Sequence, residues 1–384
     1  MALGSPDECP NDGPHNKEMR EMKARIALAL SVLLPFRAHA HVKWFSGYSY
    51  NQAPVEISSL NTPAFWALLL LSIVTIGLFV YADRVLERWP AYVNLNNRLG
   101  QYADRAPVIL RIFTGTSLLL AWQADTMIAP ELKIPNQLWG WLQFALALLM
   151  LGATTSALAG VGMIVLYLFA IYQFGMFHML DYLVYPAIGY FLLVTCVKNP
   201  KIQNTRIPVL YVGLGFSLFW AALEKVFYPA WGLEVLHQEP ALTMGLGHGF
   251  FLLACAFIEM SLGYLLIIGL LQRSLALTIT LVFFTTTCFF GKTEVVGHTI
   301  LHGALLVFIV VGRGYYFRPP IEWHKRVPLK IAFACVNFLI VGALLAWPYH
   351  QMALSAFEKR EGFREGHQAP SGAPSLDHDH PHEH

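Results

Sequence analysis

Long apolar segments recur along this chain, and they restrict it to one class of fold. A helix needs about 20 apolar residues to cross the hydrocarbon core of a bilayer, and in lipid only helices and closed barrels pair all of their own backbone polar groups. The sequence therefore predicts an all-α, polytopic transmembrane bundle of about ten spanning helices. These fall near residues 64–82, 107–124, 137–153, 158–175, 181–197, 208–226, 246–271, 274–291, 294–312 and 330–349.

The composition agrees with a membrane protein and excludes several other classes. Hydrophobic residues make up 56% of the chain and charged residues 13%, and the formal net charge is only +2. We therefore expect the lipid bilayer as a partner and no nucleic acid. The chain lacks GxxxxGK[ST], GxSxG and HExxH patterns, and its five cysteines form no CxxC pair. Nucleotide chemistry, a nucleophilic serine elbow and a thiolate metal site are thus not predicted.

The N-terminal region has the pattern of an export signal. Lys23 and Arg25 precede the apolar run IALALSVLLPF, and Ala38-His39-Ala40 supplies the small-x-small sequence that signal peptidase favours. We predict that residues 1–40 are a signal peptide or a signal anchor. Residues 41–63 would then be a periplasmic segment, beginning at His41 if cleavage follows Ala40.

Basic residues gather in loops that the helix count places on one side of the membrane. These loops lie near 83–106, 198–206 and 313–330, and the positive-inside rule makes that side cytoplasmic. We predict a bacterial inner-membrane protein with a first transmembrane helix and cytoplasmic loop at 64–106. A basic loop and a last helix follow at 313–349, and a histidine-rich periplasmic tail covers 350–384.

Two stretches of the chain resemble each other, which predicts an internal duplication. PVILR (107–111) resembles PVLYV (208–212), and Phe174-Gly175 resembles Phe290-Gly291. The predicted four-helix units are 107–197 and 206–312. Superposing the Phe-Gly pairs places His178 over Glu294 and Tyr182 over His298. An even number of helices per unit predicts parallel repeats related by an axis along the membrane normal.

The second unit resembles the DoxX-like membrane proteins over about residues 206–312. The matching positions are Arg206, Gly213, Gly215, Glu224-Lys225, the sequence Glu259-x-x-x-Gly263 and the Phe290-Gly291 turn. This resemblance implies a four-helix module, so the whole chain would contain two DoxX-like units. It also implies a link to redox chemistry, because some members look like subunits of thiosulfate or other quinone-linked oxidoreductases.

Three polar residues share one face of the predicted helix at 294–312. Glu294, His298 and His302 follow one another at four-residue intervals, so they lie along one stripe. Ionisable groups in a membrane helix indicate a functional site by default, and imidazole and carboxylate suit either a proton relay or metal ligation. The alternative is that they hydrogen-bond across helices and stabilise the bundle.

Other polar residues are expected near the same outer face. Glu259 lies too deep to reach water by snorkelling, and His248 precedes it on nearly the same helix face, so we expect a polar funnel with the histidines at 298 and 302. Glu224-Lys225 ends a helix, either in this site or as an ion pair at the membrane surface. His178 and Asp181 are spaced to share a metal or a proton, or to cap a helix.

Two further features point to metal. His41 as a new N-terminus would offer its amine and ring nitrogen to copper. The tail from Asp377 to His384 alternates histidine with acidic residues or proline, which is typical of weak divalent metal binding or of a solvating disordered tail.

The leading hypothesis is a redox-linked membrane component with a polar site at the periplasmic face, quinone or copper as cofactor, and a redox partner subunit. It assigns catalysis to Glu259, Glu294, His298 and His302, and cofactor binding to His248, Glu224 and Lys225. Metal ligands would be His41, His178, Asp181, His298 and His302. The alternatives are a copper or zinc binding or transport protein, and a scaffold whose partner carries the chemistry.

Overall fold

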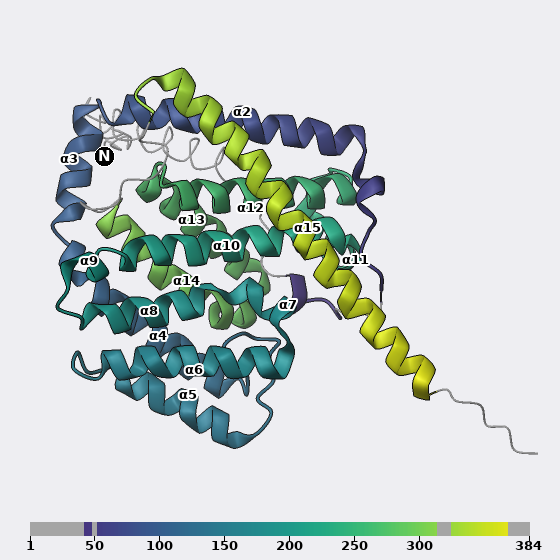
Figure 1. Ribbon diagram of the computed structural model, residues 1–384, viewed down its shortest axis with the longest axis horizontal. Helices are drawn as coiled ribbons and strands as arrows, with labels where there is room; N and C mark the ends of the chain where they lie inside the picture. Colours follow the sequence, from purple (N-terminus) through teal and green to yellow (C-terminus); the bar gives the residue numbers. More distant parts are fainter. Residues whose placement is uncertain (1–41, 48–51, 313–323, 368–384) are drawn as a thin grey trace, which may run out of the picture.

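The computed structural model describes residues 42–47, 52–312 and 324–367, and all regular elements in them are helices (Figure 1). The long helices are α2 (Pro63–Leu86), α4 (Ala106–Gln123), α5 (Gln137–Leu149), α6 (Ser156–Phe174), α8 (Val184–Thr195), α10 (Arg206–Phe227), α12 (His248–Ile268), α13 (Gln272–Phe290), α14 (Lys292–Val311) and α15 (Val327–His367). Shorter ones are η1 (Val42–Trp44), η2 (Ile57–Leu60), α3 (Pro90–Gly100), η3 (Ala103–Arg105), α7 (Met176–Met179), η4 (Leu180–Tyr182), α9 (Pro200–Gln203), α11 (Pro229–Gln238) and η5 (Pro240–Thr243). The predicted all-α class is confirmed.

Within the described residues, seven helices are long and apolar enough to cross a membrane, which is the architecture of a multi-pass membrane protein. They cover Pro63–Leu86, Ala103–Gln123, Ser156–Phe174, Pro200–Phe227, His248–Ile268, Lys292–Val311 and Val327–Lys359. Helices also occupy the other three predicted positions. The segment near 181–197 is a pair bent by 60°, α5 has only 13 residues, and α13 is not among the seven. The total of ten spans thus stays a prediction.

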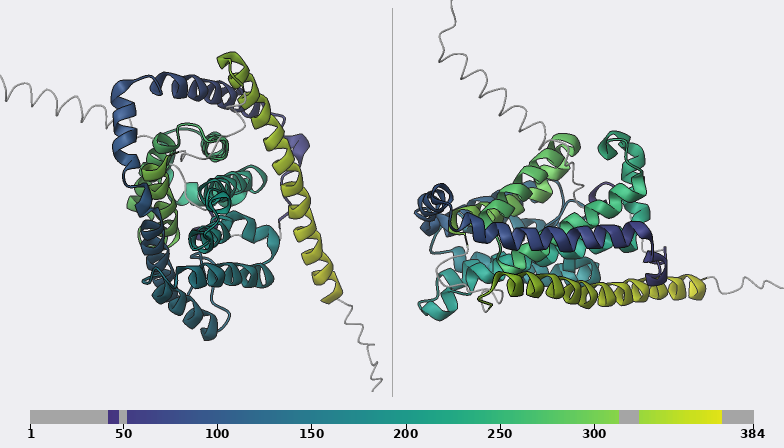
Figure 2. Two further views of the ribbon diagram at one scale, coloured as in Figure 1. Left: turned by 60° about the vertical axis from the view of Figure 1, so that its left-hand side comes forward. Right: turned by 90° about the horizontal axis from the view of Figure 1, so that it is seen from above.

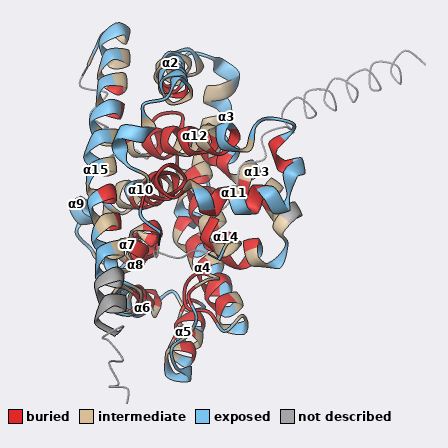
Figure 3. Ribbon diagram, turned by 90° about the vertical axis from the view of Figure 1, so that its right-hand side faces the viewer, coloured by how far each residue is buried: buried red, intermediate tan, exposed pale blue. Residues whose placement is uncertain are grey.

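The eight central helices form two layers of four. One layer runs α5, α4, α14, α13, and the other runs α6, α8, α10, α12 (Figures 1 and 2). Helices α2 and α15 pack against each other and cover α12, and α15 crosses the outer face of α10. Buried residues gather on α10 and α12, where 67% of each span is buried, against 22% for α2 and 11% for α15 (Figure 3). The core therefore lies in the central layers.

Within a layer, neighbouring helices approach closely where glycines face each other. A Cβ atom on Gly215 of α10 would lie 2.6 Å from the carbonyl oxygen of Gly263 on α12, and a Cβ on Gly263 would lie 2.5 Å from that of Gly215. Gly160 of α6 and Gly189 of α8 make an equivalent contact. Small residues are the usual means of bringing membrane helices together, since lipid provides no hydrophobic force between them.

The two predicted four-helix units are shared between the layers. In the first unit, α4 and α5 lie in one layer and α6 and α8 lie in the other. In the second unit, the first two helices, α10 and α12, join the layer of α6 and α8, and the last two, α13 and α14, join the layer of α4 and α5. The last helix of each unit packs on the first helix of the other: a Cβ on Gly303 of α14 would overlap Phe113 of α4, and one on Gly213 of α10 would overlap Ala187 of α8.

The two ends of the bundle differ in charge. The end that carries α3 and α9, here called the basic end, holds Arg84, Arg88, Arg98, Arg105, Lys201 and Arg273. Arg273 donates to the carbonyl oxygens of Ile309 and Val310, at 2.7 and 3.0 Å, and so satisfies the end of α14. The opposite end carries η1, α7 and α11 and is called the site end (Figure 1).

Helix α15 continues beyond the helix end predicted at 349 and reaches His367. Its last part overlaps the predicted tail 350–384, because good helix formers such as Met352, Ala353 and Leu354 follow without a break. Residues 368–384, and with them the histidine tract at 377–384, lie outside the described residues. The predicted signal segment 1–40 and His41 also lie outside them.

Candidate functional site

A cluster of buried charged residues lies at the site end, between the two layers. Several of its residues are placed by the ends of helices. Tyr228 leaves the helical conformation just before Pro229, as residues preceding proline do, so α10 ends directly after Glu224 and Lys225. Gly291, with φ of 62°, ends α13 and starts α14. Glu294 therefore falls in the first turn of α14, where the helix dipole favours a carboxylate.

Lys43 is the centre of the first ion pair network. Only 4% of this residue is exposed, and its Nζ atom lies 2.5 Å from Asp181 Oδ2 and 2.7 Å from Glu224 Oε2. A buried ammonium is costly unless it is paired and hydrogen-bonded. The two carboxylates come from η4 and α10, so Lys43 joins the N-terminal segment to one layer of the bundle.

Lys225 makes a second, separate ion pair. Its Nζ atom donates to Glu259 Oε2 of α12 at 2.7 Å. Glu224 and Lys225 are neighbours in sequence, but successive side chains on a helix point 100° apart, so they pair with different partners. This ion pair holds α10 to α12 near the site end.

His298 faces the same region from the other layer. Its Nδ1 atom is ion-paired with Glu294 Oε2, and the same oxygen accepts a hydrogen bond from Thr286 Oγ1 at 3.1 Å. The imidazole stacks on Phe283 with 4.2 Å between ring centroids, and the Trp44 ring lies 4.9 Å from it. Glu294 therefore orients the ring from behind, leaving Nε2 as the nitrogen available to a ligand.

Glu131 organises a third polar group beside the first two. It lies within 3.2 Å of His178 Nε2 and accepts a hydrogen bond from the Tyr182 hydroxyl. Trp44 Nε1 in turn donates to the Tyr182 oxygen at 3.1 Å. His178 pairs with Glu131 and Asp181 pairs with Lys43, so the predicted sharing of a metal or proton by His178 and Asp181 stays a prediction.

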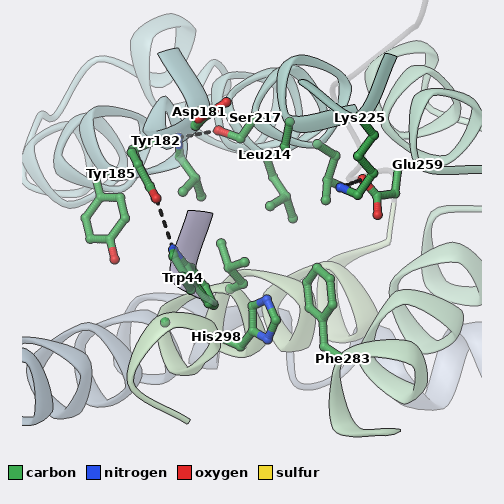
Figure 4. A pocket seen from close by; sticks show the side chains of 15 residues that line it. Trp44, Asp181, Tyr182, Tyr185, Leu214, Ser217, Lys225, Glu259, Phe283 and His298 are labelled. Carbon is green, nitrogen blue, oxygen red and sulfur yellow. Dashed lines mark hydrogen bonds and ion pairs between the residues drawn. The ribbon is translucent and has the colours of Figure 1, made fainter. Parts of the chain in front are cut away.

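These groups surround a small pocket with a free internal volume of about 40 Å³. Figure 4 shows Asp181, Ser217, Lys225 and Glu259 along one wall, and Trp44, His298 and Phe283 along the opposite wall. The remaining lining residues are mostly apolar: Tyr182, Val184, Tyr185, Leu214, Leu218, Ala221, Gly297 and Leu301. The pocket thus combines aromatic and aliphatic walls with a few charged groups, the usual make-up of a small-molecule site.

Tyr228 lies beside this cluster, just outside the span of α10. Burial raises the pKa of its phenol to about 12, with Lys43 opposing the rise and Glu224 adding to it. Its ring stacks on Trp231 at 4.2 Å between centroids. Tyr228 is therefore a neutral, well-packed group at neutral pH.

Most of the sequence-predicted site residues come together. Asp181, Lys225, Glu259 and His298 line the pocket, while Glu224 and Glu294 lie directly behind it.

The predicted residues His178, His248 and His302 are described but do not line the pocket. His302 contacts the rings of Phe283 and His298 but does not line the pocket. His248 packs on His237 with 5.0 Å between ring centroids, so the expected column with Glu259 is not formed. His41 lies outside the described residues.

The metal assignments gain no geometric support. In the part of the chain that the structure describes, no three His, Cys, Asp or Glu side chains are grouped so as to hold a metal ion. Structural and catalytic metal sites normally need at least three protein ligands. His178, Asp181, His298 and His302 therefore do not form a metal centre on their own.

Several site residues escaped the sequence reasoning, Lys43, Trp44, Glu131 and Thr286 among them. Lys43 and Trp44 follow a predicted cleavage site, where a buried residue is not expected. Glu131 lies in a loop after Pro130, and Thr286 lies in an ordinary apolar helix. One signal was available in the sequence. Four acidic residues were predicted within or near the membrane, Asp181, Glu224, Glu259 and Glu294, but Lys225 was the one lysine predicted beside them. Buried carboxylates need cationic partners, so a further buried cation could have been expected.

Comparison with family models, with curated proteins and with solved structures finds no match to this chain.

Proposed function

We propose that this chain is the quinone-binding membrane subunit of an oxidoreductase. The observation that carries the proposal is His298, an imidazole that lines the pocket, lies between Phe283 and Trp44, and is oriented from behind by buried Glu294. The DoxX-like pattern at 206–312 supports it, because some members of that family look like subunits of quinone-linked enzymes.

The residues present fit a quinone headgroup. A quinone ring is flat and apolar, with a hydrogen-bond acceptor on each side, and the pocket offers aromatic walls at Trp44, Tyr182 and Phe283. His298 and Lys225 can each donate a hydrogen bond to a carbonyl oxygen. The pocket also lies between helices of a membrane bundle, where ligand sites are commonly found.

The bound quinone supplies two-electron chemistry, since its reduction to the quinol takes up two electrons and two protons. We propose that the electrons come from a partner subunit that oxidises its own substrate, a reduced sulfur compound by the family resemblance. The chain described here supplies proton transfer and binding. Protonated His298 would donate its Nε2 proton toward a quinone oxygen and be left neutral, while Glu294 at Nδ1 favours the protonated imidazolium before the transfer. Lys225–Glu259 would be the second polar contact.

A binding experiment tests the proposal. The purified protein is titrated with a short-chain ubiquinone analogue, and we expect saturable binding that His298→Ala weakens by about tenfold or more, the cost of one charge-assisted hydrogen bond. The control His324→Ala removes a histidine at the basic end and should leave affinity within about twofold. Absence of quinone binding by the wild-type protein would overturn the proposal.

Finer features of the architecture belong to the same proposal. We infer that the two units are DoxX-like repeats, related by a pseudo-twofold axis that runs between the layers, because both Phe-Gly turns have glycines with positive φ, Gly175 and Gly291. Tyr182 and His298, at superposed positions, both line the pocket. The basic end would face the cytoplasm of a bacterial inner membrane, with the site end and the C-terminus in the periplasm.

A further inference from the structure

We propose that Asp181 is a ligand-contact residue that makes the pocket bind the quinol more tightly than the quinone. This selectivity rests on the proposed function, because it concerns the two redox forms of the same ligand. The observations behind it are the unpartnered Oδ1 atom of Asp181 and the position of this residue in the wall of the pocket.

The two carboxylate oxygens of Asp181 have different surroundings. Oδ2 accepts a hydrogen bond from Lys43 Nζ at 2.5 Å. Oδ1 is buried and has no hydrogen-bond partner among the described residues, and only 2% of the residue is exposed. A buried acceptor without a donor has lost its contact with water and gained no bond in return. Oδ1 therefore favours a ligand that brings a hydrogen-bond donor.

Donors are in short supply around this carboxylate. The Nζ atom of Lys43 also lies 2.7 Å from Glu224 Oε2, so one ammonium group serves two carboxylates. Their combined negative charge exceeds the charge of the lysine. A further donor at Asp181 would therefore be stabilising, whereas a further acceptor would be repelled.

The position of Asp181 separates it from other buried carboxylates with an unpartnered oxygen. Glu131 Oε2 and Glu294 Oε1 also have no hydrogen-bond partner within the described parts of the chain. Neither of these two residues lines the pocket, but Asp181 does. A ligand in the pocket can thus meet the carboxylate of Asp181 directly.

The opposite wall of the pocket supplies a complementary group. His298 lies across from Asp181 (Figure 4) and offers its Nε2 atom, because Glu294 takes the Nδ1 side. A quinol has two hydroxyl groups, and each can both accept and donate a hydrogen bond. One hydroxyl can accept from His298 while the other donates to Asp181 Oδ1. A quinone carbonyl has no hydrogen to donate, so it would face the carboxylate as a second acceptor.

This preference has a consequence for electron transfer. Tighter binding of the reduced form stabilises it relative to the oxidised form. For a two-electron couple, a tenfold lower dissociation constant for the quinol than for the quinone raises the reduction potential of the bound ligand by about 30 mV. Asp181 would therefore assist the electron transfer from the partner subunit that the proposed function requires.

The affinities of the two redox forms test the role of Asp181. The purified protein is titrated without oxygen, once with a short-chain ubiquinone analogue and once with the quinol of the same analogue. We expect the wild-type protein to bind the quinol at least about tenfold more tightly, the worth of a hydrogen bond to a charged group. Equal affinities for the two forms would overturn the proposal.

The variant Asp181→Asn turns the acceptor into a donor. Lys43 needs an acceptor, so the amide oxygen should remain on the lysine side and the NH₂ group should take the place of Oδ1. We expect quinol binding to weaken by about tenfold and quinone binding not to weaken, so that the preference is lost or reversed. A merely structural role would weaken both forms alike, and an unchanged ratio of affinities would overturn the proposal.

The control Asp104→Asn makes the same change at an exposed position in η3, at the basic end. It should leave both affinities within about twofold of the wild-type values. If Asp181→Asn does not fold, the comparison of the two forms in the wild-type protein decides. Binding of neither form would overturn the proposed function, whereas equal binding of both would contradict the role of Asp181 alone.

Discussion

At the residue scale, the site is built from charges that lie next to charges of opposite sign. Lys43 lies between Asp181 and Glu224, and Lys225 lies against Glu259. Burial makes each of these groups costly on its own, so the groups are stable only as sets. The effect of a substitution then depends on how many partners it leaves unpaired.

The Lys43 network predicts different losses of stability for two substitutions. Lys43→Met leaves two buried carboxylates without their cation and should lower the free energy of unfolding by roughly 3–5 kcal/mol. Asp181→Asn leaves the Lys43–Glu224 pair intact and should cost less than about 2 kcal/mol. Thermal unfolding of the purified proteins in one detergent measures both, and equal losses would contradict this account of the network.

Glu294 and His298 give a second prediction at this scale. Glu294→Gln keeps the side-chain shape but removes the charge that orients and stabilises the imidazole. We expect it to weaken binding of the quinone analogue about fivefold to tenfold, less than His298→Ala, because a positioning residue acts through its partner. A loss equal to that of His298→Ala, together with lowered thermal stability, would indicate a structural role for the pair instead.

At the scale of elements, the seam between α10 and α12 sets where the charged residues meet. Gly215 and Gly263 bring the two backbones together, and Lys225–Glu259 joins the helices nearer the site end. Without the close seam, Lys225 would not reach Glu259. The glycines are therefore a requirement of the site as well as of the fold.

This seam is tested with two glycines in similar helices. Gly215→Val would drive a side chain into Gly263 and should cost about 1–3 kcal/mol of stability through overpacking. Gly342 of α15 has nothing within 4 Å of where its Cβ would lie, so Gly342→Val should change stability by less than about 0.5 kcal/mol. Melting temperatures of the two variants decide the point, and similar shifts in both would refute it.

At the scale of the whole molecule, the pocket lies between two layers that are each tightly packed internally. The neighbours within a layer share long helix contacts, whereas the layers meet mainly through α5–α6 and α12–α13. The basic residues gathered at the basic end give the molecule a polarity that matches the proposed orientation.

Orientation is tested by labelling introduced cysteines in intact cells, with the native cysteines removed. Glu239 is exposed next to α11 at the site end, and Lys201 is exposed in α9 at the basic end. An impermeant maleimide should label Glu239→Cys in intact cells and Lys201→Cys only after permeabilisation. The reverse pattern would invert the topology and place the pocket toward the cytoplasm.

The amino-acid sequence alone determined the helical class, the position of most helices and the separation of charge between the two ends. It also identified candidate site residues, namely Glu224, Lys225, Glu259, Glu294 and His298. These properties follow from local features: apolar length, helical periodicity and the cost of a charge in lipid.

The tertiary structure alone decided which charges meet. It brought Lys43 from the N-terminal segment to Asp181 and Glu224, turned His178 to Glu131, and left His248 beside His237. It also divided each predicted unit between two layers. Such pairings join residues far apart in the chain. They depend on how the helices pack against one another, and the periodicity of a single segment does not predict that packing.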